Sequence, residues 1–135
     1  MQKLVTADAS PLIGLAAADA FSVLRELFGT VTITRTVKEE VMAGGGLPGA
    51  HELHAAMREG WIRVAPTPPD TWRFTSLDAG EASTIALALQ HQGALVLMDD
   101  ELGRAQAAAL GLEVMDLDEL LRAAKATRPT DTRNP

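Results

Sequence analysis

Short apolar runs alternate along the chain with longer segments whose apolar residues recur every three to four positions. The short runs are rich in Leu, Val and Ile, which is typical of buried strands. They cover residues 4–7, 31–33, 61–64, 94–98 and 112–115. The segments between them predict helices, so the chain consists of repeated βα units. We therefore expect an α/β fold, a three-layer α/β/α sandwich around a central, mostly parallel sheet of about four to five strands.

Capping residues and glycines predict where these helices begin and end. Ser10 followed by Pro11 predicts the start of the first helix, which breaks near Asp19. Two capping boxes are predicted, Thr36 with Glu39 and Asp78 with Glu81. Other helices are expected over residues 19–28, 51–59, 101–110 and 117–126. The glycine run 44–49 lacks the Lys-Ser/Thr of a phosphate-binding loop and is predicted to be a flexible connection.

Length and composition favour one domain with one core. The chain has 135 residues, of which 47% are hydrophobic, and we expect a single domain over residues 1–126. Residues 127–135 are polar and contain two prolines, so a disordered tail is expected. The sequence has no cysteine, which excludes disulfides and thiolate chemistry and suits a reducing cytoplasm. No apolar run approaches the roughly 18 residues of a membrane span, so a cytoplasmic protein is expected.

The formal net charge of −6 argues against a broad basic surface for nucleic acid. Divalent cations held by clustered acids would nevertheless reverse the local field that a phosphate meets. Net charge alone therefore does not decide between these readings.

Carboxylates follow two of the predicted strands directly. Asp8 follows the first strand, and Asp99 and Asp100 follow the strand over residues 94–98. Strand carboxyl ends in an open parallel sheet meet at the crevice where ligands bind, so these acids can converge there. Two unit charges about 5 Å apart at an effective dielectric near 20 repel by roughly 3 kcal/mol, which a bound cation would relieve.

Glu40 and Glu81, near predicted helix starts, complete a set of oxygen ligands suited to Mg²⁺ or Mn²⁺. Capping is the alternative for Glu81, through its pairing with Asp78, and for Asp99 and Asp100 ahead of the next helix. The histidines are expected on the surface rather than as zinc ligands; they are His51, His54 and His91.

Taken in order, four segments of the chain resemble the motifs of PIN-domain proteins. They are residues 7–13 (ADASPLI), 36–41 (TVKEEV), 77–82 (LDAGEA) and 97–100 (LMDD). The resemblance covers residues 4–121. Within the family, the chain is most similar to a prokaryotic, toxin-like subgroup. It implies a parallel sheet flanked by helices, an acidic metal pocket and hydrolysis of RNA phosphodiester bonds.

The resemblance also implies roles for individual residues. The matching catalytic and metal-binding acids are Asp8, Glu40, Glu81 and Asp100, with Asp99 as a neighbouring metal ligand. Ser10 matches a small hydroxyl residue that often lies beside the first aspartate, and a substrate-binding role follows for it. Residues 115–118 replace a Gly-Thr turn that many relatives have, so Asp116 could either join or disturb the pocket.

The function implied by the resemblance is a Mg²⁺- or Mn²⁺-dependent endoribonuclease, a candidate toxin of a type II toxin–antitoxin module. The implied partners are an RNA substrate, a small antitoxin protein and a second copy in a homodimer. Residues near the acids that could contact RNA phosphates, or simply be solvated, are Arg35, Lys38 and Arg104. A catalytically silent PIN-like binding module is the alternative. A signalling receiver domain ranks below both, because receivers place an acidic pair after the first strand and a lysine after the last.

Overall fold

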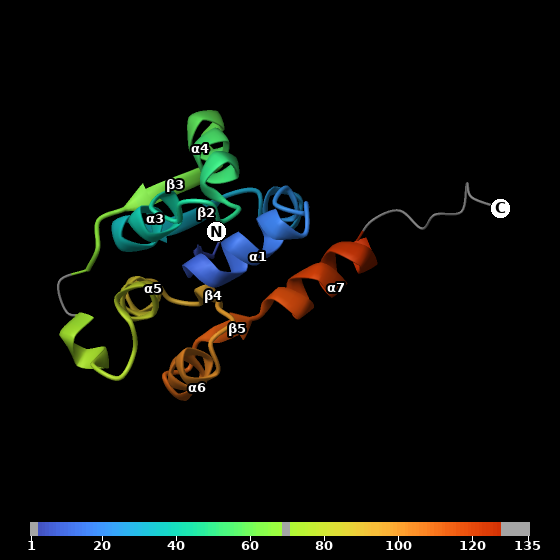
Figure 1. The fold of residues 1–135 in the computed structure, drawn as a ribbon. Helices are drawn as coiled ribbons and strands as arrows, with labels where there is room; N and C mark the ends of the chain where they lie inside the picture. The colour runs from blue at the N-terminus through green and yellow to red at the C-terminus, as the bar shows by residue number, and fades with distance from the viewer. Residues whose placement is uncertain (1–2, 69–70, 128–135) are drawn as a thin grey trace.

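The computed structural model describes residues 3–68 and 71–127, and its centre is a parallel sheet (Figure 1). The five strands are β1 (Val5–Ala7), β2 (Val31–Thr34), β3 (Ile62–Ala65), β4 (Leu95–Leu97) and β5 (Glu113–Met115). Their spatial order is β3-β2-β1-β4-β5, and each neighbouring pair is parallel. The predicted α/β sandwich with a parallel sheet of four to five strands is confirmed.

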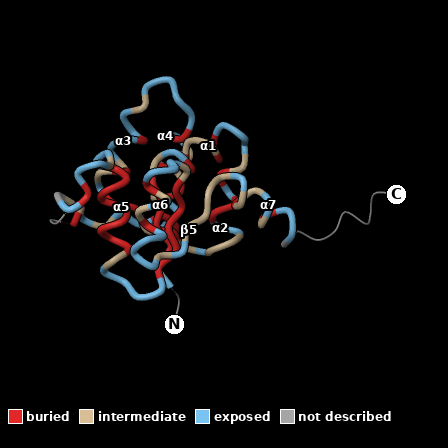
Figure 2. Tube along the Cα trace, turned by 90° about the horizontal axis from the view of Figure 1, so that it is seen from below, coloured by how far each residue is buried: buried red, intermediate tan, exposed pale blue. Residues whose placement is uncertain are grey.

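Helices cover both faces of this sheet because side chains along each strand alternate between the faces. In β4, Leu95 and Leu97 join one buried cluster and Val96 joins the other. The first cluster packs against α1 (Ala9–Ala17), α2 (Val23–Phe28), α3 (Arg35–Met42), α4 (Ala50–Glu59) and α7 (Leu117–Thr127). The second packs against η1 (Thr71–Phe74), α5 (Ala79–Leu89) and α6 (Glu101–Ala109). Figure 2 shows the buried strands between the two helical layers.

The strand order reverses between β1 and β4. From β1 the chain moves to β2 and β3 on one side, and it then returns to β4 and β5 on the other. In open α/β sheets this reversal leaves a crevice beyond the carboxyl ends of the two strands. Ala7 lies opposite Leu97, and the Asp8 N–H donates to the Leu97 carbonyl at 2.9 Å. The first residue after β1 is thereby fixed at this crevice.

Two predicted helix starts are wrong by two residues, and the helix expected over residues 19–28 begins only at Val23. Asp8, not Ser10, is the N-cap of α1, which places Pro11 as the third helical residue. Proline is tolerated there because its missing N–H would have no partner within the helix. Thr34, not Thr36, caps α3: its Oγ1 accepts the Val37 N–H at 3.1 Å.

The reason for the second error is that β2 passes into α3 without an intervening loop. Thr36 is therefore inside the helix, and its Oγ1 lies 2.7 Å from the Thr67 Oγ1 instead of capping. The capping box with Glu39 predicted for this position does not form, since Thr34 already fills the cap.

The capping box at the start of α5 is confirmed. The Glu81 N–H donates to Asp78 Oδ1 at 2.9 Å, and the Asp78 N–H donates to Glu81 Oε1 at 3.3 Å. Helix α7 runs to Thr127, and the rest of the predicted tail 127–135 lies outside the described residues. None of the helices within residues 3–68 and 71–127 combines the length and apolar character needed to span a membrane.

Candidate metal and active site

Asp8 is the most deeply buried acid at the crevice. Its exposed fraction is 4%, because it lies between the end of β1 and the start of α1 under the N-terminal turn of α5. A buried carboxylate normally requires an ion-pair partner or several hydrogen-bond donors. Here the Asp8 carboxylate accepts no capping hydrogen bond from the first turn of α1, although the Ala9 amide interacts with it.

Gly80, in the first turn of α5, brings Asp8 and Glu40 together. A Cβ atom at Gly80 would lie 2.9 Å from Asp8 Oδ1 and 2.1 Å from Glu40 Oε1. The two carboxylates therefore face the same small space, which exists only because residue 80 has no side chain. Glu40 reaches this space from α3, where the residue as a whole is exposed to solvent.

The pKa values of three acids in this region are raised, as expected for buried carboxylates close to other carboxylates. Burial raises the pKa of Asp8 to about 7, the Ala9 amide opposes the rise, and repulsion from Asp78, Glu81 and Glu40 adds to it. Burial followed by repulsion from Asp78 also raises the pKa of Glu40 above its ordinary value. Uncompensated negative charge is thus concentrated at this point of the sheet edge.

Glu81 links the group to Asp100. Burial raises the pKa of the Glu81 carboxyl, the Asp78 amide lowers it, and the charges of Asp78, Asp100 and Glu40 raise it further. We refer to Asp8, Glu40, Asp78, Glu81 and Asp100 as the acidic cluster. The four acids predicted to be catalytic are therefore coupled electrostatically in one region.

Asp78 is the member of the cluster that the sequence prediction left out of the site. Its capping box with Glu81 accounted for it fully as a helix cap. The structure shows that the same carboxylate also acts on Asp8, Glu40 and Glu81. A capping box that opens a helix at the carboxyl edge of the sheet is the signal that could have identified it.

Asp100 in the cluster and Asp99 beside it both accept backbone N–H groups at helix starts. Asp100 Oδ2 accepts the Gly103 N–H at 2.8 Å, at the start of α6. Asp99 Oδ1 accepts the Leu117 N–H at 2.7 Å, at the start of α7. The metal-binding role predicted for Asp99 stays a prediction, beside this observed capping role.

Asp116 is held within its own local network. Its Oδ1 accepts the Glu119 N–H at 2.8 Å, and its Oδ2 lies 3.5 Å from Arg104 Nη1. Ser10, the predicted substrate-binding residue, is exposed in the first turn of α1, two positions after Asp8. Its predicted role also stays a prediction.

The donor set and the space at Gly80 fit a hard divalent cation. Mg²⁺ usually keeps several water ligands and is held by only one or two protein carboxylates, which Asp8 and Glu40 can supply. Within residues 3–68 and 71–127, no three acidic, histidine or cysteine side chains stand close enough to form a complete metal-binding group. The cluster thus offers a two-carboxylate site with further acids beside it.

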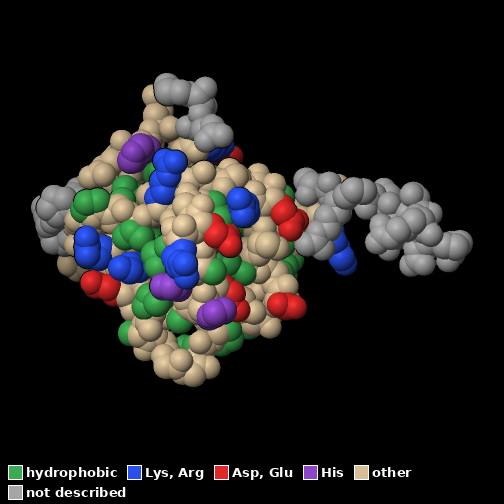
Figure 3. Space-filling model, turned by 90° about the horizontal axis from the view of Figure 1, so that it is seen from above, with side chains coloured by type: hydrophobic (Ala, Val, Ile, Leu, Met, Phe, Trp, Pro, Cys, Tyr) green, Lys and Arg blue, Asp and Glu red, His purple; other side chains and the backbone are tan. Residues whose placement is uncertain are grey.

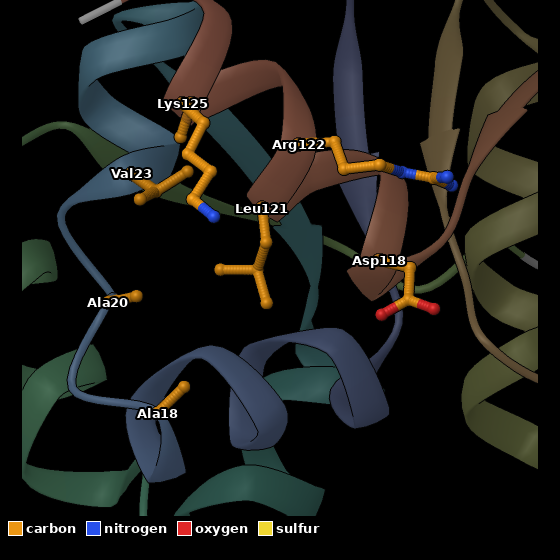
Figure 4. A pocket seen from close by; sticks show the side chains of 8 residues that line it. Ala18, Ala20, Val23, Asp118, Leu121, Arg122 and Lys125 are labelled. Atoms are coloured by element: carbon orange, nitrogen blue, oxygen red, sulfur yellow. The ribbon is translucent and has the colours of Figure 1, made fainter.

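A separate apolar groove lies away from the acidic cluster. It has a volume of about 580 Å³ and runs between α7 and the connection from α1 to α2 (Figure 4). Its lining includes Val23 and Leu121, together with the charged residues Asp118, Arg122 and Lys125. The groove lacks the concentration of carboxylates that marks the sheet edge.

Comparison with known proteins identifies the fold. A family model described as a PIN domain matches residues 4–134. The chain matches none of the curated proteins.

Two solved structures resemble the chain over most of its length. One is the PilT N-terminus domain protein SSO1118 from the archaeon Sulfolobus solfataricus P2, with a TM-score of 0.67 and 18% identity. The match covers 93% of this chain and 97% of that one. The other, PAE2754 from Pyrobaculum aerophilum, has a TM-score of 0.64 and 19% identity, covering 94% and 100% of the two chains. At these identities the likeness concerns the fold.

Proposed function

This chain belongs to the PIN-domain family, and we propose that it is an endoribonuclease that depends on Mg²⁺ or Mn²⁺. The resemblance inferred from the sequence motifs is thereby confirmed, and PIN domains are generally nuclease domains. The observation that supports the proposal best is the burial of Asp8 among other carboxylates, next to the space at Gly80. Such an arrangement is costly without a cation and favourable with one.

Asp8 and Glu40 would hold the cation from the two sides of the Gly80 space, with Glu81 and Asp100 contributing through water or directly. When bound, the cation supplies a water of lowered pKa and neutralises charge on the phosphate. Glu40 is the acid best placed to accept a proton from the attacking water, because it is solvent-exposed. Glu81 is less free for this role, since its Oε1 accepts the Asp78 N–H.

The charge on one face of the molecule is mixed rather than broadly basic. Figure 3, which views the molecule from the side of α4, shows basic and acidic side chains interspersed on that face. Arg35 is exposed in the first turn of α3, the helix that carries Glu40, and is proposed to contact RNA phosphates.

Cleavage of total RNA by the purified protein with Mn²⁺ tests the proposal. Asp8→Asn is expected to lower the rate at least about 10³-fold, which corresponds to about 4 kcal/mol of transition-state stabilisation. Asp118→Asn, the same change at an exposed aspartate on α7, is the matched control and should cleave at the parent rate. The products should carry 5′-phosphates, and EDTA should stop the reaction. Unchanged Mn²⁺-dependent cleavage by Asp8→Asn would show that the assignment is wrong.

A silent binding module is the second candidate, because no complete three-ligand group is preformed within the described part of the chain. Calorimetry with Mn²⁺ separates the two functions. A nuclease should bind the ion and lose most of that affinity in Asp100→Asn, whereas a module that keeps these acids for stability should bind no ion.

We also propose that the protein acts as a toxin and pairs with a small antitoxin and with a second copy. Family membership supports this, because PIN-domain proteins often bind RNA and antitoxins. Expression in a bacterial host should arrest growth for the parent and not for Asp8→Asn. Light scattering should give the mass of a dimer, and a monomer mass at micromolar concentration would contradict the pairing.

A further inference from the structure

A chain of buried hydroxyl groups connects α3 and α5, the helices that carry Glu40 and Glu81. Thr34, Ser83 and Thr84 are each fully buried, with an exposed fraction of 0%. The Thr34 Oγ1 lies 2.7 Å from the Ser83 Oγ. The hydroxyls of Ser83 and Thr84 donate to the Gly80 carbonyl at 2.9 and 2.8 Å.

The direction of these hydrogen bonds follows from counting protons. Each hydroxyl has one proton, and Ser83 gives its proton to the Gly80 carbonyl, which can only accept. Thr34 must therefore donate to Ser83, while its own oxygen accepts the Val37 N–H at 3.1 Å. A single directed path thus runs from the first turn of α3 through Thr34 and Ser83 to Gly80.

This path ends at the residue that separates the two central carboxylates. Gly80 faces Asp8 Oδ1 and Glu40 Oε1, and Glu40 is carried by the same helix whose first turn Thr34 caps. The Thr34–Ser83 hydrogen bond therefore ties the N-cap of α3 to α5, the two helices that carry Glu40 and Gly80. Thr84 bonds to the same carbonyl but stays within α5, so it makes no such connection.

We propose that Thr34 and Ser83 are positioning residues, which hold Glu40 at the distance from Asp8 that a divalent cation needs. This inference rests on the proposed function in one respect: it requires that the protein binds a divalent cation, and it does not require that the protein cleaves RNA. Residues that orient metal ligands typically change metal affinity 10- to 100-fold when they are removed.

Ser83→Ala and Thr84→Val form a matched pair for the test. Each removes one buried hydroxyl donor from the Gly80 carbonyl, and Ser83→Ala also leaves the Thr34 hydroxyl without its acceptor, so Ser83→Ala should lower Tm more than Thr84→Val does. Calorimetry with Mn²⁺ should show about 10-fold weaker binding for Ser83→Ala and affinity within about twofold of the parent for Thr84→Val. Equal losses of affinity in the two variants, or none in Ser83→Ala, would overturn the proposal.

Variants of Thr34 supply the rescue experiment. Thr34→Ser keeps the hydroxyl and should bind Mn²⁺ as the parent does. Thr34→Val should weaken Mn²⁺ binding as Ser83→Ala does and should also lose stability, because it removes the cap on the Val37 N–H. The double variant Thr34→Val/Ser83→Ala should bind no more weakly than either single variant, because both break the same link. Additive losses would contradict a shared link.

A metal-free measurement separates failure of this inference from failure of the proposed function. Amide chemical shifts of residues 36–40, recorded by NMR without metal, should change in Ser83→Ala and stay constant in Thr84→Val. If the parent binds no Mn²⁺ but these shifts respond, the positioning link stands and the proposed function fails. If the α3 amides do not respond, the link itself is refuted.

Discussion

Two groups of carboxylates lie at the same edge of the sheet in different environments. In the acidic cluster, Asp8 is buried among like charges and Glu40 faces it across the Gly80 space. Beside β4 and β5, Asp99 and Asp116 each accept a backbone N–H at a helix start, at 2.7 and 2.8 Å. We call this second pair the capping carboxylates.

The difference shows that the partner of a carboxylate, rather than its place at a strand end, indicates its role. Backbone N–H groups at a helix start stabilise an ionised acid, so Asp99 and Asp116 need no cation. Asp78 and Asp100 also cap helices, and the member that sets the acidic cluster apart is Asp8. The ionised form of Asp8 is disfavoured by burial and by repulsion from neighbouring acids, and the Ala9 amide stabilises it. A cation is the partner that this environment lacks, and each prediction below tests that contrast.

The largest expected effect is on the stability of the metal-free protein when Asp8 is neutralised. The pKa of Asp8 is raised from 3.8 to about 7 on folding, so the unfolded state loses its proton first as pH rises. Stability therefore falls between about pH 4 and pH 7, by up to about 4 kcal/mol. Asp8→Asn should be more stable than the parent by an amount approaching this at pH 8 and nearly equal to it at pH 3.

Urea unfolding at the two pH values measures this effect, with Asp118→Asn as the control. Asparagine has almost the shape of aspartate, so the comparison isolates the charge. The prediction is contradicted if the stability of the parent rises from pH 4 to pH 7 and Asp8→Asn is no more stable than the parent at pH 8. The ionised Asp8 carboxylate would then not be destabilised by its surroundings.

The second effect is stabilisation by the metal. A ligand that binds only the folded state adds about 2.7 kcal/mol at 100 times its Kd. Mn²⁺ should raise Tm accordingly, more at pH 8 than at pH 5, because protons compete for Asp8 below its pKa of about 7. EDTA should reverse the gain. Equal stabilisation of Asp8→Asn by Mn²⁺ would place the ion outside the acidic cluster.

Third, Gly80→Ala should weaken Mn²⁺ binding about tenfold, or about 1.4 kcal/mol. The added Cβ would meet Glu40 Oε1 at 2.1 Å and push that carboxylate out of the shared space. Gly14→Ala in α1 is the matched control, since its Cβ would meet only the end of the Leu117 side chain, Cδ2, at 2.7 Å. Calorimetry should show parent affinity for the control, and undiminished binding by Gly80→Ala would remove Gly80 from the site.

Much of the fold could be predicted from the sequence, because strand-length apolar runs and caps are local signals. The position of Asp8 and Asp100 at the sheet edge was predictable for the same reason. The start of α3 was misplaced by two residues, since nothing in the sequence marks a strand that passes directly into a helix.

Interactions between distant segments were beyond the reach of local patterns. Asp78 had a complete local explanation as a cap, and its effect on Asp8 exists only after folding. The bond between Thr34 and Ser83 joins residues 49 positions apart, so spacing could not reveal it. The capping partner of Asp99 likewise lies 18 residues away, at the start of α7.

The smallest effect concerns Asp99 and separates its two roles. Asp99→Asn keeps an oxygen that can accept the Leu117 N–H but removes the charge, whereas Asp99→Ala removes both. If Asp99 is only a capping carboxylate, Asp99→Ala should lose about 1 kcal/mol of stability and Asp99→Asn much less. RNA cleavage should then stay near the parent rate in Asp99→Asn. If Asp99→Asn loses most of the cleavage activity while its stability is unchanged, Asp99 is a metal ligand, because this substitution alters only the charge of the side chain.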